Sequence, residues 1–395
     1  MNSPGYWKLA CSLVSLLLLV CCPVSGHTAD ALTSLTGMRD SRYYNYEMRG
    51  QSSASVRLSQ SLWEGGATEA RIAIEKARLS SSRYHLLDAA SSLAFDAVTA
   101  HVAVVRQRTL VELAHQNIRD YTKTITLLRS RVSSGLTTPG DIRLVESRLF
   151  RAEATLAEYQ SELLSAKADF EMVTGQPVPL RLASVSIPHR LYNSSAEVID
   201  ACRLRNPRLL AEQEAISVAR GQEKLARAGD APKIGLEVGP RWHIQDTPQD
   251  SSNHGWDAFV TFQWNLYEGG ANQAAKRSAA AQKRQARHNL KSVVDTLEAD
   301  ILGTWARYQA AAERMHFYEK SMNTARRARG IFYEQYLLGS KTLLDLLDAD
   351  NEYFLAASQY TVAQADRIIG AYRLLTLGGD ILHTLGLSLP DVAEN

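Results

Sequence analysis

Cysteine is scarce in this sequence, and three of its four cysteines fall within the first 22 residues. In this leader Lys8 precedes the apolar run LACSLVSLLLLVCC, and small residues follow in PVSGHTA. The pattern predicts a secretory signal peptide cleaved after Gly26. A valine precedes Cys21, where a lipoprotein signal needs a small residue, so lipidation of Cys21 or Cys22 is the less favoured alternative. The mature chain keeps only Cys202, which excludes an internal disulfide framework and a metal cage built from cysteines.

Long apolar runs, an excess of one charge and catalytic motifs are also missing. No run of eighteen apolar residues follows the leader, so a membrane could be crossed only by strands of a closed barrel. The 44 Lys and Arg residues are matched by 42 Asp and Glu residues, which argues against a nucleic-acid partner. The ten histidines form no His-Glu-x-x-His pair, and no Gly-x-Ser-x-Gly elbow occurs. We therefore expect no catalytic residue, cofactor or metal site.

Proline and internal glycine are absent from residues 67–133, and only Gly303 and Gly330 interrupt residues 271–338. Each stretch predicts a helix about 100 Å long at about 1.5 Å per residue. Each is followed by a second helix in which apolar residues recur at alternating steps of three and four, the pattern of a coiled-coil seam. The two seams comprise Ile142, Val145, Leu149, Ala152, Leu156, Tyr159, Leu163, Ala166, Phe170 and Val173, and Leu346, Ala349, Tyr353, Ala356, Tyr360 and Ala363.

The sequence repeats itself once. LWEGG at residues 62–66 and LYEGG at residues 266–270 are separated by an offset of 204 residues. The same offset relates three further pairs, namely Gly135 and Gly339, Asp141 and Asp345, and Gly175 and Gly379. The chain therefore contains two copies of one unit. Each copy reads as strand, very long helix, tight break and second helix.

Strand patterns precede both long helices. Apolar and polar residues alternate over residues 233–244 and 256–266, with the polar stretch 245–255 expected as a loop between them. The first copy shows the alternation over residues 54–62, with a weaker partner strand at 42–50. Such strands suit a transmembrane barrel with one face to lipid and one to water. A soluble antiparallel sheet with one wet face fits the alternation equally well.

The strand-to-helix LYEGG, the helical tip YLLGSKTLLDLLDADNEYF and the twofold strand-hairpin repeat resemble the TolC family of outer-membrane exit ducts. The resemblance implies an α+β membrane protein of Gram-negative bacteria. Three protomers would each give four strands to one trimeric 12-stranded β-barrel in the outer membrane. The barrel would continue as a long antiparallel α-helical coiled-coil barrel, a tunnel through the periplasm. An isolated helical hairpin, such as an adaptor arm, is the alternative for the helices alone.

The resemblance also divides the chain. Family members have an N-terminal helix before the first strand, but only about fifteen residues lie between the leader and Arg42, so we expect that helix to be missing. The expected parts are a signal peptide (1–26), the first strands (27–66), a first helical hairpin (67–175, tip near 135–141), an equatorial linker (176–193), a helix stacking on the hairpin (194–230), the second β-hairpin (231–268), a second helical hairpin (269–379, tip near 339–345) and a tail (380–395).

Function in this family is conduction, not catalysis. The sequence LLDLLDADNEYF…AYRLL resembles the type I protein-secretion branch, with adhesin export as one option. The outer-membrane component of a multidrug or small-molecule efflux pump is the alternative, and a periplasmic helical adaptor the second alternative. The expected partners are two further copies of the chain, outer-membrane lipid, a periplasmic adaptor (membrane fusion) protein and an inner-membrane ABC or RND-type transporter.

The resemblance assigns a periplasmic gate to the tips of the hairpins. Tyr336 and Lys341 match a tyrosine and an arginine that bind neighbouring helices in the closed state, and Asp141 matches the carboxylate that receives the tyrosine. Two positions depart from the family. Lys341 replaces an arginine and loses its forked hydrogen bonding, and Gly140 replaces a threonine. We therefore expect a gate that is held more loosely.

The remaining expected positions are acidic residues and glycines. Asp345 and Asp348 match an acidic pair that rings the entrance and favours cations. A carboxylate at the start of a helix also stabilises that helix, which is the structural alternative for Asp345 and Asp141. Glycines form the expected tip turns (Gly135 and Gly339) and the strand-to-helix turns (Gly65, Gly66, Gly269 and Gly270).

Overall fold

The computed structural model describes residues 51–387, with gaps at 184, 189–190 and 246–250. The chain divides into two units. One contains the described residues up to Ile72 together with Gln222–Ala279, and it holds the β-sheet. The other contains Ala73–Gly221 and the described residues from Ala280 onward. The strand expected at 42–50 and the expected absence of a helix before it lie outside the described residues.

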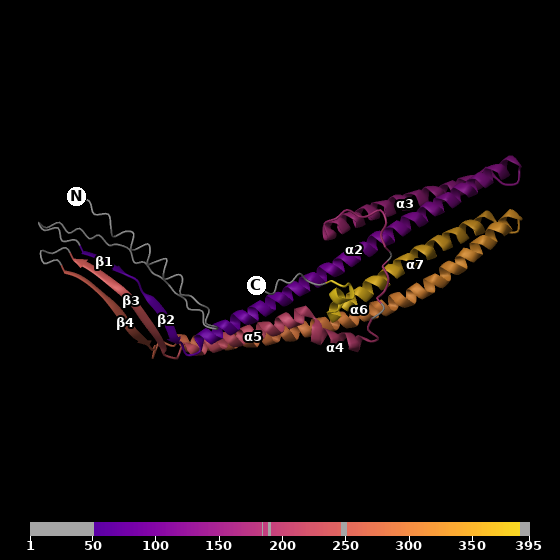
Figure 1. The fold of residues 1–395 in the computed structure, drawn as a ribbon. Helices are drawn as coiled ribbons and strands as arrows, with labels where there is room; N and C mark the ends of the chain where they lie inside the picture. Colours follow the sequence, from indigo (N-terminus) through magenta and orange to yellow (C-terminus); the bar gives the residue numbers. More distant parts are fainter. Residues whose placement is uncertain (1–50, 184, 189–190, 246–250, 388–395) are drawn as a thin grey trace, which may run out of the picture. The chain divides into compact units, whose positions relative to one another are not determined.

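The sheet is antiparallel and is built around β3, Lys233–Gln245. One edge of β3 pairs first with β1, Gln51–Ser55, and then with β2, Leu58–Trp63. The other edge pairs along its whole length with β4, Ser251–Gln263. Because β1 and β2 follow one another along the same edge in one register as far as Ser61, they are two segments of the strand that the alternation over 54–62 predicts (Figure 1).

Gly239 and Pro240 of β3 lie opposite the break between β1 and β2. Proline has no N–H to donate, and its carbonyl oxygen accepts a hydrogen bond from the Val56 amide at 3.1 Å. A Cβ atom on residue 239 would lie only 1.8 Å from the Val56 carbonyl oxygen. Only glycine therefore allows the two backbones to come this close.

The loop predicted over 245–255 is wrong in its extent. The strands continue into it, since β3 ends at Gln245 and β4 begins at Ser251, with Gln245 paired to Ser251. At its other end β4 stops at Gln263, three residues before Leu266. Backbone ladder bonds do not require apolar side chains, so the alternation of side chains marked neither end of the hairpin.

The two faces of the sheet differ in polarity. Ile234, Leu236 and Val238 pair with Phe262, Val260 and Ala258, which places the apolar residues of both strands on one face. That face is uncovered in the protomer: Trp256, Val260 and Phe262 are 77%, 70% and 64% exposed. The other face carries the ion pairs Arg57–Glu237 and Arg241–Asp257, each at 3.6 Å. An apolar, unburied sheet face backed by a charged face is what a lipid-facing barrel wall requires.

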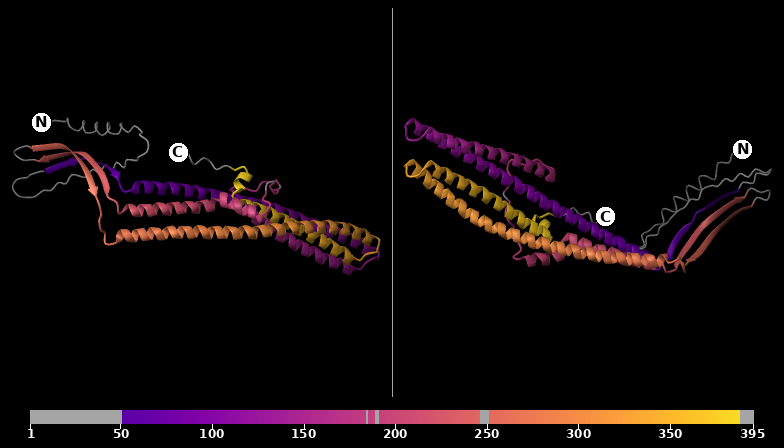
Figure 2. Two further views of the ribbon diagram at one scale, coloured as in Figure 1. Left: turned by 90° about the horizontal axis from the view of Figure 1, so that it is seen from below. Right: turned by 180° about the vertical axis from the view of Figure 1, so that it is seen from behind.

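Two helical hairpins account for most of the second unit. The first joins α2, Ala67–Ser133, to α3, Pro139–Thr174, and the second joins α6, Ala271–Leu337, to α7, Leu343–Gly378. The long helices have 67 residues each and the returning helices 36 each, so the repeat is maintained without a gap. Figures 1 and 2 show α3 folded back along α2 and α7 along α6. By length and composition alone, α2 also contains a stretch apolar enough to cross a membrane, which for one helix is weak evidence.

Apolar side chains from all four hairpin helices meet near the tips. Tyr121 and Leu128 of α2, Val145 of α3, Tyr336 of α6 and Leu347 of α7 belong to one buried cluster. Val145 is a predicted seam position, and the seam residues Ile142 and Leu149 pack against the same cluster. The coiled-coil pattern therefore corresponds to the surface along which the helices of the hairpins pack.

The helix that links the repeats is split at Asn206 into α4, Ser195–Arg205, and α5, Pro207–Ala228. The Asn206 side-chain amide donates to the carbonyl oxygen of Leu377 at 2.9 Å, and its oxygen accepts from the Leu209 amide at 3.2 Å. Asn206 thus caps the end of α7 and the start of α5 together. A short helix, α8, Ile381–Thr384, follows α7. Cys202 of α4 is buried against α6 and α7. Burial raises the pKa of its thiol to about 11, so the thiol is protonated at neutral pH.

Candidate functional site at the tips of the helical hairpins

Both tips turn at a glycine in the left-handed region, with φ of 73° at Gly135 and 76° at Gly339. The two turns have the same hydrogen bonds. The Gly135 amide donates to the Val132 carbonyl at 3.0 Å, and the Gly339 amide donates to the Tyr336 carbonyl at 3.1 Å. In each turn the amide of the next residue donates to the carbonyl oxygen five residues earlier, Leu136 to Arg131 and Ser340 to Gln335, at 2.9 Å each. The glycines are required because a side chain would strain this backbone conformation.

The first turn of each returning helix is fastened by a threonine and an aspartate. The Asp345 amide donates to the Thr342 hydroxyl at 3.2 Å, and the Thr342 amide donates back to the Asp345 carboxylate at 3.0 Å. The Thr138 amide and hydroxyl donate to the Asp141 carboxylate at 3.1 Å each. The Thr137 hydroxyl also donates to the Asp141 carboxylate. Hydrogen bonds from Thr342 hold the pKa of the Asp345 carboxyl below its ordinary value, and those from Thr137 and Thr138 do the same for Asp141. Asp345 and Asp141 therefore act as helix caps within the protomer.

The three residues predicted for the gate share no hydrogen bond or ion pair with one another within the described part of the protomer. Tyr336 is 5% exposed, and its ring lies 4.7 Å from the guanidinium carbon of Arg131. Lys341 lies 3.8 Å from Asp345 and over the ring of Phe332. Asp141 is engaged by Thr137 and Thr138. A gate formed by Tyr336, Lys341 and Asp141 would thus join different protomers, and it stays a prediction.

Arg131 was not identified from the sequence. Its guanidinium donates to the carbonyl oxygens of Tyr336 at 3.3 Å and Leu337 at 3.0 Å, so it ties the first hairpin to the end of α6. A basic residue in the last turn of a helix is a favourable arrangement in itself. That position could have drawn attention to Arg131, but the sequence does not show that it serves the neighbouring helix.

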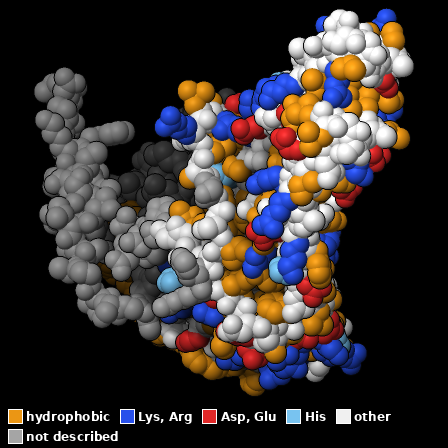
Figure 3. Space-filling model, turned by 90° about the vertical axis from the view of Figure 1, so that its right-hand side faces the viewer, with side chains coloured by type: hydrophobic (Ala, Val, Ile, Leu, Met, Phe, Trp, Pro, Cys, Tyr) orange, Lys and Arg blue, Asp and Glu red, His pale blue; other side chains and the backbone are white. Residues whose placement is uncertain are grey.

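The predicted acidic pair at the entrance is divided between two environments. Asp345 caps α7, whereas the Asp348 side chain is 64% exposed and lies 3.7 Å from Arg148 of α3. Asp348 is thus free to face water on one side while it contacts the first hairpin on the other. Side chains of both charges and apolar side chains mix over the face in Figure 3, without a field of one sign.

The strand-to-helix turns are also duplicated. Gly65 and Gly66 have φ of 62° and 86°, and Gly269 and Gly270 have φ of 60° and 89°. In both turns the first helical amide donates to the backbone carbonyl oxygen of the glutamate three residues earlier at 3.1 Å. At Gly65 the space for a side chain is also closed, because a Cβ there would lie 2.2 Å from the Cβ of Ala231. Two successive left-handed residues explain the abrupt change from strand to helix.

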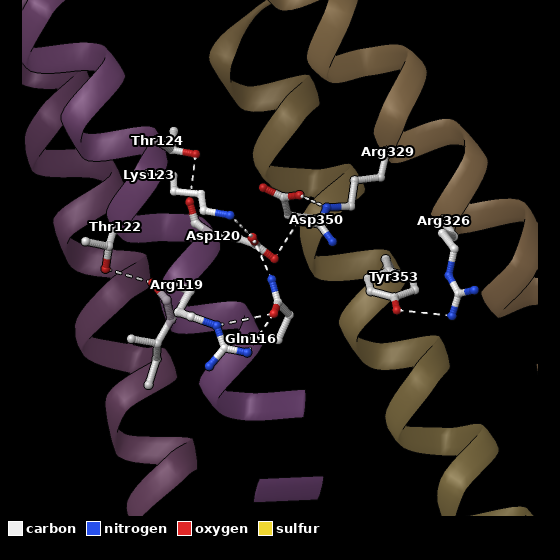
Figure 4. Close-up of polar contacts among 11 residues, drawn as sticks. Gln116, Arg119, Asp120, Thr122, Lys123, Thr124, Arg326, Arg329, Asp350 and Tyr353 are labelled. Carbon is white, nitrogen blue, oxygen red and sulfur yellow. Dashed lines mark hydrogen bonds and ion pairs between the residues drawn. The ribbon is translucent and has the colours of Figure 1, made fainter. Parts of the chain in front are cut away.

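A second polar layer, also missed, lies deeper between the hairpins (Figure 4). Arg329 of α6 forms ion pairs with Asp120 of α2 at 2.5 Å and with Asp350 of α7 at 2.6 Å. Burial raises the pKa of Asp350, and Arg329 opposes that rise. Asp350 lies four residues after the seam position Leu346 and three before Tyr353, a spacing that could have drawn attention to it, but the predicted seam passes through Ala349 instead. The periodicity gives no such indication for Asp120 or Arg329.

Known proteins match this chain over both of its repeats. The family profile OEP, described as Outer membrane efflux protein, matches residues 31–176 and 198–380. The Outer membrane efflux protein BepC of Brucella suis is 24% identical over 84% of this chain and 73% of its own length. The Proteases secretion protein PrtF of Dickeya chrysanthemi is 24% identical over 72% of this chain and 62% of its own length.

Among solved structures, CusC, described with transmembrane channel formation, has a TM-score of 0.78 with 16% identity. It covers 89% of this chain and 84% of the CusC chain, and at this identity it shows the fold alone. The resemblance to the TolC family and the expected fold class are confirmed, and the protein is a channel of the Gram-negative outer membrane rather than an enzyme. The chain belongs to the outer membrane efflux protein family.

Proposed function

We propose that the chain is the exit duct of a type I protein-secretion system. In this role it is a homotrimer that docks a periplasmic adaptor and an inner-membrane ABC transporter. Unfolded proteins pass through the trimer from the transporter to the exterior, with adhesins as one possible cargo class. The observation that best supports a duct is the uncovered apolar face of a sheet whose strands run directly into helices about 100 Å long.

Two observations favour a protein cargo: the sequence at the tip of the second hairpin and the printed description of one relative. The tip from Tyr336 to Phe354 resembles the secretion branch of the family, and PrtF is described as a proteases secretion protein. A tunnel for unfolded chains needs no shaped binding pocket, so the cargo has to be identified by experiment. The periplasmic adaptor alternative is abandoned, because the chain belongs to a family of outer-membrane channels.

Small-molecule efflux is the second candidate, and the observation that favours it is the similarity to BepC, described as an outer membrane efflux protein. In that case the same trimer would work with an RND-type transporter. The gate and the barrel would be unchanged, because both functions need only an opening at the tips. The partner transporter therefore decides between the two candidates.

Deleting the gene in its native host tests the proposal. We expect specific proteins to disappear from the culture medium or cell surface, measured by mass spectrometry, and to return when the intact chain is supplied again. Drug susceptibility, measured in parallel, should change little. An unchanged set of exported proteins with a marked rise in drug susceptibility would instead establish the efflux candidate.

A further inference from the structure

We propose that Arg329 is a positioning residue that holds the two hairpins of one protomer together and thereby controls how far the tip can open. Arg329, Asp120 and Asp350 are named here the cross-hairpin clamp. The proposal rests on the proposed function as a channel. It assigns a role to a layer separate from Tyr336, Lys341 and Asp141.

The clamp has one arm within a hairpin and one arm between hairpins. The Arg329 Nε atom donates to an Asp350 carboxylate oxygen at 2.6 Å, and both residues belong to the second hairpin. The Arg329 Nη2 atom lies 2.5 Å from a carboxylate oxygen of Asp120, which belongs to the first hairpin. The guanidinium uses different nitrogens for the two carboxylates, which the single ammonium group of a lysine does not allow.

The surroundings fix Arg329 and limit its access to water. The exposed fractions are 26% for Arg329, 13% for Asp120 and 7% for Asp350. Tyr353 supports the guanidinium from α7, with its ring centroid 5.3 Å from the central carbon. Gln116 of α2 donates to the remaining oxygen of Asp120 at 2.9 Å and keeps that carboxylate in place (Figure 4). The side chain is thus held in the geometry that bridges the two hairpins.

Opening the hairpins would act selectively on this clamp. If the second hairpin moves away from the first, Arg329 leaves with Asp350, and the cross-hairpin ion pair with Asp120 is broken. Lys123 is the other cation near Asp120, but it lies 3.9 Å away and its side chain is 76% exposed. Asp120 would then keep the neutral amide of Gln116 and this screened cation, and it would lose its close charged partner. A half-broken buried pair is unfavourable, so the clamp opposes separation.

The other polar bridges between the hairpins are weaker or lie at a different level. Arg148 and Asp348 are 3.7 Å apart, with Asp348 largely exposed. Arg131 binds backbone carbonyls at the end of α6. Arg329 lies ten residues before the turn at Gly339, about 15 Å along the helix. The clamp therefore restrains the hairpins behind the tip, and the tip contacts can break without breaking it.

Single-channel recording of the full chain in planar lipid bilayers tests the clamp. We expect Arg329→Met and Asp120→Asn each to raise the open probability about tenfold or more, because each breaks the cross-hairpin pair. The double variant should open no more than either single variant, because both remove the same interaction. Arg329→Lys, which keeps the charge but not the fork, should fall between wild type and Arg329→Met.

Arg326→Met is the matched control. Arg326 lies on the same helix one turn earlier, and the contacts that the structure gives it, to the Tyr353 hydroxyl at 3.4 Å and over the Tyr353 ring, stay within the second hairpin. Its open probability should equal that of wild type. All variants must give the heat-resistant trimer of the wild type, which separates positioning from a loss of folding. Wild-type open probability in both Asp120→Asn and Arg329→Lys would overturn the clamp, whereas a wild-type chain without pores would instead refute the channel itself.

Discussion

At the scale of single residues, equivalent positions at the two tips stabilise the helix end through different side chains. Thr137 and Lys341 are related by the offset of 204, and each contacts the aspartate four residues later. In the first repeat the contact is a hydroxyl hydrogen bond, and in the second it is an ion pair at 3.8 Å. Both contacts stabilise the first turn of a returning helix, where a negative charge is favourable. Asp141 and Asp345 therefore stabilise helix ends within the protomer, whatever charge they also give to an entrance.

Replacing Asp345 by alanine should loosen the start of α7 in a pH-dependent way. Hydrogen bonds from Thr342 hold the pKa of this carboxyl below its ordinary value, so the folded chain binds its proton less tightly than the unfolded chain. The stability it contributes is present above the ordinary pKa and is lost as the pH falls through the lowered pKa. Hydrogen-exchange protection of residues 342–348 should thus be lower in Asp345→Ala at pH 7 and converge with wild type in acid. Asp348→Ala, at an exposed position, is the control, and equal protection at pH 7 would contradict the capping role.

The gate assignment is tested by Tyr336→Phe combined with Lys341→Ala. If these side chains bind neighbouring protomers in the closed trimer, losing both should raise the single-channel conductance in planar bilayers. Tyr336→Phe alone keeps an aromatic ring beneath Arg131, so the packing of the apolar cluster is maintained. Unchanged conductance in the double variant would reject both residues as gate residues.

At the scale of helices and strands, the two repeats have the same lengths but different surroundings. The structure gives seventeen buried residues in α7 and four in α3. The difference arises because α7 packs against α4 and α2 as well as α6, whereas the buried residues of α3 pack chiefly against α2 and near the tip cluster. The exposed faces of α3, with Phe150 at 65% and Leu164 at 70%, are available for a neighbouring protomer.

Lysine scanning of β4 tests whether the sheet faces lipid. Val260, 70% exposed on the apolar face, and Thr261, on the charged face, are adjacent and point to opposite sides. A lysine on a lipid face costs about 2–4 kcal/mol near the middle of the bilayer. Val260→Lys should therefore lower the yield of heat-resistant trimer in the outer-membrane fraction, while Thr261→Lys should assemble like wild type. The same yield for both variants would indicate that the sheet has no lipid-facing side.

At the scale of the whole molecule, periodicity and repetition in the sequence predicted most of the fold. Helices without proline and seams at steps of three and four predicted the two hairpins because these patterns are local, and the glycines at one offset predicted the turns because the sequence repeats itself. The ends of β3 and β4 were not predictable, since ladder pairing is set by the backbone. The clamp and Arg131 were missed because their partners are distant in the sequence: Asp120 and Arg329 are separated by about the length of one repeat, and only packing of the hairpins brings them together.

The most direct test of the central claim, that this chain builds a hollow trimer anchored in lipid, is single-channel recording on the purified mature protein reconstituted into planar bilayers. We expect discrete, long-lived conductance steps from a particle with the mass of three protomers, because the uncovered apolar face of the sheet has to be covered by lipid. A freely soluble monomer that produces no conductance after reconstitution would contradict the account.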